Sequence, residues 1–233
     1  MIKLESGEAV AEIAPKRGAI CKRLRLAGEE LLYLDQATFA DPSKNVRGGI
    51  PVLFPIAGKP PAGSGLSQHG WARGLAWQPT QTGPASVECR LAHGGFDLLI
   101  RYTLSERAFL LEAQIDGEGP FQWGFHPYFA CTDKSAARIE TKATRAIDNQ
   151  TEAEVPYSPP DFEHTQPDLR LLDHREAGTV LHRGTQRPVK LRYSPDFELL
   201  VLWTQPGKPF VCAEPWTQRW LAAPHRLAFE ISL

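Results

Sequence analysis

Apolar and polar residues alternate with a period of two in many short segments of this 233-residue chain. The pattern predicts strands at 9–14 and 20–26, joined by a turn at Pro15–Gly18, and another at 31–34 after a second turn at 27–30. The 20 prolines and 19 glycines are spread over the whole length and interrupt these segments. The sequence is therefore typical of strands joined by turns.

Further strands follow the same alternation. They are predicted at 86–91, 96–104, 109–115, 189–193, 199–203, 210–213 and 227–231. The first three form a meander with a turn at His93–Gly95. The helical pattern is weak, with one short turn expected within 31–40, and the proline-rich stretch 155–167 is expected to be a long loop. Strands without interleaved helices favour an all-β, antiparallel sandwich, and no change of composition marks a linker, so we expect one domain over residues 1–233.

Composition and charge narrow the function. The formal net charge is −1 and the pI is about 6.7, which argues against nucleic acid as a partner. We find no signal peptide and no apolar run that would span a bilayer, so no membrane partner is expected. The cysteines contain no CxxC pair and are typical of reduced thiols in a cytoplasmic protein; they are Cys21, Cys89, Cys131 and Cys212.

The chain lacks the usual sequence motifs of several enzyme classes. The chain has no HxH or HExxH pattern, no Gly-rich nucleotide loop and no GxSxG elbow. Dehydrogenases, kinases and serine hydrolases are therefore poor interpretations, and we expect neither a cofactor nor a dedicated metal site. Five histidines in turns and polar loops are expected to be solvated; they are His93, His164, His174, His182 and His225.

Two segments in the first third combine donors with a constrained backbone. In 46–58, Arg47 precedes a glycine pair and an apolar run that Pro51 and Pro55 prevent from forming a regular central strand. Its guanidinium suits sugar hydroxyls, a carboxylate or a phosphate, and the alternative is a surface ion pair. In 68–77, the donors Gln68, His69 and Arg73 lie among tryptophans, an arrangement that suits a pyranose, and the alternative is a buried tryptophan loop.

Two groups able to transfer protons lie within apolar runs. His126 stands between aromatic residues, and Pro127 favours an extended backbone that projects the ring. Glu214 ends an apolar strand, where a carboxylate is rarely buried without a purpose. The alternatives are a packed core histidine and a buried salt bridge of Glu214 with an arginine. Burial moves both pKa values toward neutrality, where acid–base catalysis works best.

Four segments in this order resemble the aldose 1-epimerase (galactose mutarotase) family. They are RGGIPVLFPIAG (47–58), QHGWAR (68–73), GFHPYF (124–129) and VCAEPWT (211–217). The resemblance implies a galactose mutarotase-like antiparallel β-supersandwich, a sugar substrate, no cofactor, and a monomer or homodimer. It implies Glu214 as catalytic base, His126 as catalytic histidine, and His69 and Arg73 as substrate-binding residues.

The resemblance also leaves three points open. A substrate-binding aspartate is expected, with Asp173 as the better match and Asp148 as the weaker one. Arg47, Gln68 and Arg73 resemble the hexose-6-phosphate 1-epimerase branch, in which arginines hold the phosphate. The predicted function is interconversion of the α and β anomers of a hexose; the alternatives are a hexose-6-phosphate 1-epimerase and a non-catalytic sugar-binding protein on the same fold.

Overall fold

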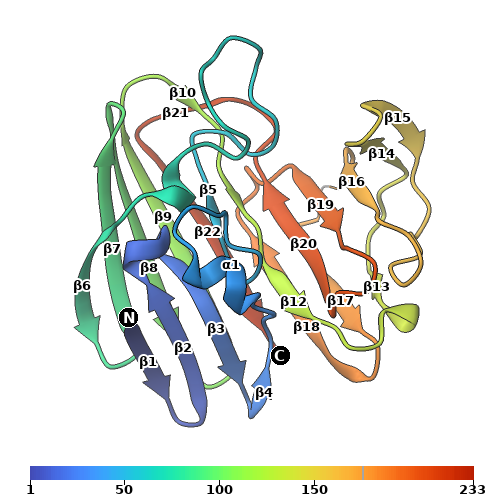
Figure 1. Cartoon of the computed structure of the whole chain (residues 1–233), viewed down its shortest axis with the longest axis horizontal. Coiled ribbons are helices and arrows are strands. Elements are labelled where there is room, and N and C mark those ends of the chain that lie inside the picture. The colour runs from blue at the N-terminus through green and yellow to red at the C-terminus, as the bar shows by residue number, and fades with distance from the viewer. Residues whose placement is uncertain (175) are drawn as a thin grey trace.

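The computed structural model describes residues 1–174 and 176–233, and almost all of its regular structure is β-strand (Figure 1). The named strands pair antiparallel throughout the described part, in four sheets. Helical structure there is limited to α1 (Gln36–Ala40) and 3₁₀ turns at Pro15–Arg17, Ala72–Gly74 and Lys134–Ala136. None of the described helices has the length or hydropathy needed to cross a membrane. The predicted all-β antiparallel class is confirmed.

One eight-stranded sheet, which we call the back sheet, contains the predicted meander. Its spatial order is β13 (Arg138–Ile139), β17 (Gly178–Arg183), β18 (Gln186–Tyr193), β22 (His225–Ser232), β9 (Ala108–Gly117), β8 (Phe96–Leu104), β7 (Ser86–His93) and β6 (Gln78–Gly83). From Leu98 to Leu104 of β8 every second residue is buried and the residues between them are partly or fully exposed, the pattern of a sheet with one face on the core.

The second large sheet, the cleft sheet, carries the candidate site. Its spatial order is β15 (Ala153–Pro156), β14 (Arg145–Asp148), β16 (Asp168–Leu171), β19 (Leu199–Trp203), β20 (Phe210–Trp216), β11 (Gly124–Phe125) and β5 (Val52–Leu53), with β12 (Tyr128–Ala130) also paired to β20. Strand β20 is buried along its whole length. Its odd-numbered Val211 and Ala213 belong to the main core, so the even-numbered residues face the other side of the sheet.

The two large sheets pack against each other through apolar side chains. Phe125 of β11 stacks on Phe229 of β22 with ring centroids 5.5 Å apart. A four-stranded N-terminal sheet joins the same core, in the order β1 (Ile2–Ser6), β2 (Ala9–Ala14), β3 (Ile20–Leu26) and β4 (Glu29–Glu30). The fourth sheet pairs only β10 (Pro120–Phe121) with β21 (Leu221–Ala222). With one face of the cleft sheet covered by the core, its other face is available for a ligand.

Local differences from the predicted elements have physical causes. Residues 52–53 form a two-residue strand at the edge of the cleft sheet, as expected for an apolar run between prolines, which lack the N–H that a central strand needs. The predicted strand at 31–34 forms isolated bridges at Leu32 and Leu34 instead. The first two residues of the predicted loop 155–167 belong to strand β15 instead, in which Val155 pairs with Ala146.

Candidate active site

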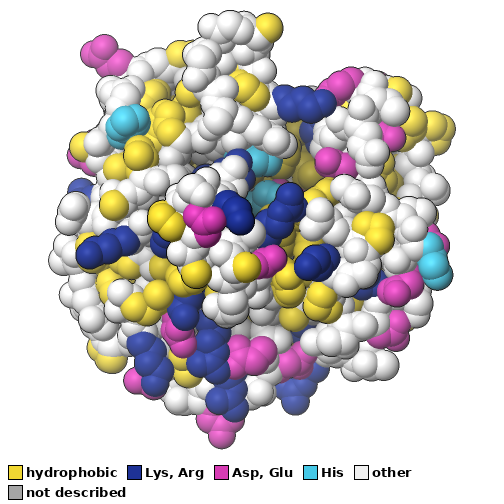
Figure 2. Space-filling model, in the orientation of Figure 1, with side chains coloured by type: hydrophobic (Ala, Val, Ile, Leu, Met, Phe, Trp, Pro, Cys, Tyr) yellow, Lys and Arg dark blue, Asp and Glu magenta, His cyan; other side chains and the backbone are white. Residues whose placement is uncertain are grey.

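A cavity of about 850 Å³ lies on the exposed face of the cleft sheet. Six of the seven residues predicted for the site line it: Arg47, Gln68, His69, Arg73, His126 and Glu214. Figure 2 shows it as a hollow with histidine side chains at its floor and Lys and Arg side chains around it. The site is therefore assembled from segments at 47–73, 126 and 214 that lie far apart in the sequence.

The register of the cleft sheet places His126 opposite Glu214. Gly124 of β11 pairs with Trp216, and Tyr128 of β12 pairs with Cys212. His126 lies midway between these two pairs and Glu214 lies midway on the partner strand, so the residues are cross-strand neighbours. The His126 amide donates to the carbonyl of Pro51 at 3.1 Å, which ties this break between β11 and β12 to the 47–58 segment.

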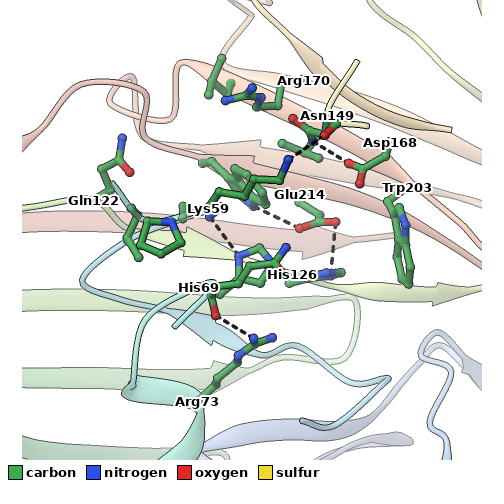
Figure 3. A pocket seen from close by; sticks show the side chains of 18 of the residues that line it. Lys59, His69, Arg73, Gln122, His126, Asn149, Asp168, Arg170, Trp203 and Glu214 are labelled. Carbon is green, nitrogen blue, oxygen red and sulfur yellow. Dashed lines mark hydrogen bonds and ion pairs between the residues drawn. The ribbon is translucent and has the colours of Figure 1, made fainter. Parts of the chain in front are cut away.

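Glu214 is a buried carboxylate with few compensating contacts. It is 1 % exposed, and its Oε2 accepts a hydrogen bond from Nε1 of Trp216 at 3.1 Å. Its Oε1 lies 3.3 Å from Nδ1 of His126 (Figure 3). Burial raises the pKa of Glu214 well above its ordinary value, and the negative charge of Asp168 raises it further. In the described part of the chain no arginine forms the buried salt bridge with Glu214 that was the alternative interpretation.

His126 is packed between aromatic rings and the carboxylate. Its ring stacks on Tyr128 with centroids 4.6 Å apart and meets Trp203 edge-on at 5.7 Å. Burial lowers the pKa of His126 well below its ordinary value, away from neutrality and contrary to the expectation from the sequence, and the nearby His69 and Arg73 add to the shift. Among the described residues Nδ1 has no hydrogen-bond partner, because its approach to Glu214 lies outside hydrogen-bond geometry. Both pKa shifts favour the neutral forms, a protonated carboxyl on Glu214 and an uncharged imidazole on His126.

His69 is fixed by a strained loop. Its φ is 64°, a conformation that residues other than glycine rarely adopt. The His69 amide donates to the carbonyl of Gly58 at 2.9 Å, and the Gly58 amide donates back to Nδ1 of His69 at 3.0 Å. Burial lowers the pKa of His69 to about 3, so the ring is neutral and, with Nδ1 an acceptor, carries its proton on Nε2. His69 therefore presents a hydrogen-bond donor to the cavity.

The predicted donors around His69 line the same cavity. Arg73 donates from Nη2 to the backbone carbonyl of Gln68 at 2.8 Å, which holds its guanidinium near the cavity floor. Arg47 is exposed, and its guanidinium lies 5.9 Å from the ring of Trp203. Both arginine charges act on His126 and on Tyr128, so both guanidinium groups lie near the floor of the site.

Asp168, rather than Asp173, is the aspartate at the cavity. Asp168 and Asn149 both line it, and the Asn149 amide donates to the Asp168 carboxylate (Figure 3). Asp173 lies away from it, where its carboxylate accepts hydrogen bonds from Thr144 at 2.7 and 3.0 Å. Asp148 shares the face of β14 with the core residue Ala146. The structure thus places Asp168 at the cavity, whereas neither of the expected residues, Asp173 and Asp148, lines it.

Asp168 carries a signal in the sequence, although the segment before it is a loop. Residues 168–171 read Asp-Leu-Arg-Leu, and their period of two alternates polar with apolar side chains. In the structure Leu171 joins the core, and Asp168 and Arg170 face the cavity. The strand at 168–171 was not predicted, so its polar face was not considered.

One further expectation from the sequence was wrong. His174 was expected to be solvated, but it is fully buried. Its Nδ1 lies 2.9 Å from Oγ1 of Thr141 and 3.0 Å from a carboxylate oxygen of Glu176, and its Nε2 contacts the hydroxyl of Tyr193. His93 and His164 are exposed as expected. The four cysteines are buried free thiols.

A match to a protein-family model shows to which family the chain belongs. The model described as aldose 1-epimerase matches residues 1–233, the whole chain. The chain belongs to the aldose 1-epimerase family. Members of this family act on sugars as isomerases, which agrees with a polar cavity holding a carboxylate, histidines and arginines.

Individual relatives of this aldose 1-epimerase family member agree with the fold. The Slr1438 protein of Synechocystis sp. PCC 6803 superimposes with a TM-score of 0.90 at 28 % identity, over 99 % of this chain and 94 % of that one. A Salmonella typhimurium structure called "a putative mutarotase (YeaD)" superimposes with a TM-score of 0.84 at 25 % identity, over 99 % and 88 %. The predicted galactose mutarotase-like supersandwich is confirmed.

Two curated relatives carry a more specific name, "Putative glucose-6-phosphate 1-epimerase". The protein from Cenchrus ciliaris is 31 % identical over 139 residues, which are 48 % of this chain and 41 % of that protein. The protein from Salmonella typhimurium is 27 % identical over 172 residues, which are 67 % and 58 %. The chain thus matches about half the length of these two relatives.

Proposed function

We propose that this protein is an aldose 1-epimerase that interconverts the α and β anomers of a hexose by opening and closing the sugar ring. The observation that carries the proposal is the buried pair of His126 and Glu214, 3.3 Å apart on the cavity floor. Ring opening needs one group to remove a proton and another to supply one. A pair of this kind within one polar cavity meets that need.

The chemistry assigns one task to each member of the pair. Glu214 takes the proton of the hydroxyl on C1, and His126 donates a proton to the ring oxygen. The C1–O5 bond breaks as the C1–O1 double bond forms, giving the open-chain aldehyde. Rotation about C1–C2 then exposes the other face of the carbonyl. Closure reverses both proton transfers, so the protein ends in its starting state.

The directions of the two pKa shifts support these roles. A carboxylate whose pKa is raised by burial is a stronger base than an exposed one. An imidazolium whose pKa is lowered by burial is a stronger acid. Oε1 of Glu214 and Nδ1 of His126 are 3.3 Å apart, so a small reorientation of either side chain aligns them for transfer of the carboxyl proton to the imidazole, which forms the ion pair that the reaction needs. Each positioned group accounts for roughly 10²–10⁴-fold acceleration.

The remaining polar groups of the cavity orient the sugar. His69 offers its Nε2 proton, Arg73 offers a guanidinium, and Asp168 accepts from a hydroxyl. Trp216 and Trp203 supply aromatic surface for the C–H face of the ring. The family model over residues 1–233 supports a single domain, and the four buried free thiols suit a reducing compartment such as the cytoplasm.

A second candidate function, hexose-6-phosphate 1-epimerase, differs in substrate alone. Arg47 and Arg73 both line the cavity, and neither has a carboxylate within salt-bridge distance in the described part of the chain. Two guanidinium groups without anionic partners suit a phosphate. The names of the two curated relatives favour the same substrate.

The test is the rate of exchange between anomers, measured by NMR with glucose, galactose and glucose 6-phosphate in parallel. We expect the protein to accelerate exchange above the rate in buffer for at least one of these sugars. Comparing the accelerations for the three sugars shows whether the protein prefers a neutral or a phosphorylated hexose. Sugar binding without acceleration would overturn the epimerase proposal and favour the non-catalytic carbohydrate-binding alternative.

A further inference from the structure

A third side chain, that of the fully buried Cys212, lies beneath the cavity floor next to the acid–base pair. Cys212 precedes Glu214 by two residues on β20, so both side chains lie on the face of the strand that points toward the cavity. Tyr128, which stacks on His126, pairs with Cys212 across the sheet. The thiol of Cys212 is therefore a neighbour of both members of the pair.

The donor atoms of these three residues are close together. Nδ1 or Nε2 of His126, Sγ of Cys212 and a carboxylate oxygen of Glu214 all lie within 4.8 Å of one another. Zinc binds thiolate sulfur at about 2.3 Å and imidazole nitrogen at about 2.0 Å, so a tetrahedral site separates its donors by roughly 3.3–3.8 Å. The Nδ1–Oε1 distance of 3.3 Å already fits such a site.

A second, independent feature points to a ligand here. His126 is 8 % exposed, and its buried Nδ1 has no hydrogen-bond partner in the described part of the chain. A buried polar atom without a partner is costly, because it has lost its water and gained nothing in return. This nitrogen is directed toward Glu214, as Figure 3 shows. A metal ion at this point would satisfy it.

We propose that His126, Cys212 and Glu214 form a binding site for a thiophilic divalent cation, such as Zn²⁺, whose occupation excludes the sugar from the proton-transferring pair. The nitrogen, sulfur and oxygen donors select zinc-like ions over Mg²⁺ and Ca²⁺, which require oxygen ligands. Three protein ligands leave the fourth position of a tetrahedral ion to a water molecule.

Charge balance favours a divalent ion in this buried place. A thiolate and a carboxylate without a counterion would carry a large desolvation cost, whereas a doubly positive ion neutralises both. His126 and Glu214 line the cavity, so an ion reaches these two ligands from the cavity and Cys212 binds it from beneath. Since the ligands come from two distant segments, no sequence motif indicates the site, and the sequence alone predicts no metal at these residues.

The test is spectroscopic and does not require sugar turnover. Co²⁺ replaces Zn²⁺ in sites of this kind, and a Co²⁺–thiolate bond gives a charge-transfer band in the near ultraviolet. The purified protein is titrated with Co²⁺, and bound Co²⁺ is then displaced with Zn²⁺. We expect a thiolate band that saturates at one equivalent and disappears as Zn²⁺ binds. Absence of the band in the wild-type protein would overturn the proposal.

Cysteine variants locate the bound ion. Cys212→Ala should abolish the band and weaken Zn²⁺ binding by more than about 100-fold, since loss of even an outer-shell partner costs about 10–100-fold. Cys89→Ala is the matched control, because Cys89 is also fully buried but lies in the back sheet. Cys212→Ser provides a second variant of nearly native size if the alanine variant does not fold. A band that persists in the Cys212 variants would place the ion elsewhere and refute this site.

Sugar competition connects the metal site with the cavity. Increasing concentrations of a sugar whose anomer exchange the protein accelerates should lower the apparent affinity for Co²⁺. Conversely, Zn²⁺ should raise the apparent KM for that sugar without changing kcat. If the protein accelerates the anomer exchange of no sugar, the proposed function fails, but the cobalt spectrum still shows whether the metal site exists. Co²⁺ binding at Cys212 that leaves sugar turnover unchanged would contradict exclusion of the sugar.

Discussion

Nδ1 of His126 and Oε1 of Glu214 lie 3.3 Å apart because two strands of the cleft sheet hold them in register. His126 occupies the break between β11 and β12, where Pro127 interrupts the hydrogen-bond ladder. Glu214 lies within β20, an interior strand of the sheet that is buried along its whole length. A rigid sheet therefore fixes the distance between the acid and the base, which is the kind of support that catalysis requires.

Replacing Glu214 by glutamine should remove the base and keep the shape of the site. The glutamine side-chain oxygen can still accept the hydrogen bond of Trp216. We expect anomer exchange to fall by at least about 10²-fold with sugar binding retained. NMR exchange rates and a binding titration measure the two quantities. Glu152→Gln, which changes an exposed carboxylate of the same cavity, is the control and should retain its rate. Wild-type exchange in the Glu214 variant would refute the assignment.

Arg47→Ala tests whether the site holds a phosphate. Removing an unpaired guanidinium should weaken glucose 6-phosphate far more than glucose, by about 10-fold or more, since hydrogen bonds to charged groups contribute about 1.5–3 kcal/mol. Lys59→Ala is the matched control, because Lys59 lines the same cavity but is paired with Glu152 at 2.8 Å. KM values from exchange rates at several sugar concentrations give the comparison. Equal losses for both sugars would show that Arg47 does not recognise the phosphate.

Asp168→Asn should act on binding and on the pH profile together. It removes an acceptor for a sugar hydroxyl, so KM should rise about 10-fold or more. It also removes a negative charge that raises the pKa of Glu214, so that pKa should fall. Because exchange needs the carboxylate form of Glu214, the acidic limb of kcat/KM should move to lower pH.

Asp173→Asn is the matched control for this prediction. Its carboxylate lies away from the cavity and accepts hydrogen bonds from Thr144, so turnover and pH profile should match the wild type while stability decreases by about 1 kcal/mol. Exchange rates from pH 4 to 8 and denaturant unfolding distinguish the two variants. An acidic limb that stays in place in Asp168→Asn would disprove the coupling.

The contrast between Asp168 and Asp173 shows how far the sequence alone reaches. His126, Glu214 and His69 were predictable because each polar group stands in an apolar or aromatic run, where burial of a polar group needs a reason. The strands were predictable from a period of two where one face meets the core. Asp168 was missed because its strand is only four residues long and follows a proline-rich loop.

Relations between distant strands were not predictable from the sequence. Local patterns contain no information on register, and a shift of one residue would turn Glu214 into the core. The same holds for the cluster of Cys212 with His126, and for His174, whose polar surroundings in the sequence gave no sign of its burial. Such groupings depend on which strands become neighbours.

His69 should make stability depend on pH in a defined window. Its pKa is 6.5 in an unfolded chain and about 3 in the folded protein, so between these values only the unfolded chain binds the proton. Stability should therefore fall as the pH falls through this window, by at most about 1.4 kcal/mol per pH unit for this group.

His69→Asn removes the titrating group and keeps a residue that tolerates positive φ. Denaturant unfolding at pH 7, 6, 5 and 4 should show a smaller loss of stability for this variant than for the wild type. His93→Asn, a change at an exposed histidine at the end of β7, should leave the dependence unchanged. Parallel curves for the wild type and His69→Asn would show that His69 does not contribute.

Gly70 should be the glycine on which the position of His69 depends. Its φ is +68°, and a Cβ there would lie 2.1 Å from the carbonyl oxygen of Phe54. That oxygen also accepts the amides of Trp71 and Ala72, so its displacement would disturb the loop that holds His69 over the cavity. Gly70→Ala should therefore destabilise the protein and lower the exchange rate.

Gly63→Ala separates this steric effect from backbone preference. Gly63 has a similar φ of +77°, and a Cβ there would meet no atom within 4 Å, so its substitution carries only the left-handed penalty of about 1–2 kcal/mol. Gly70→Ala should cost about 1–3 kcal/mol more, because backbone atoms must move to admit the methyl group. Denaturant unfolding and anomer exchange of the two variants provide the comparison. Equal stability and equal exchange in both would mean that contact with Phe54 does not hold the His69 loop.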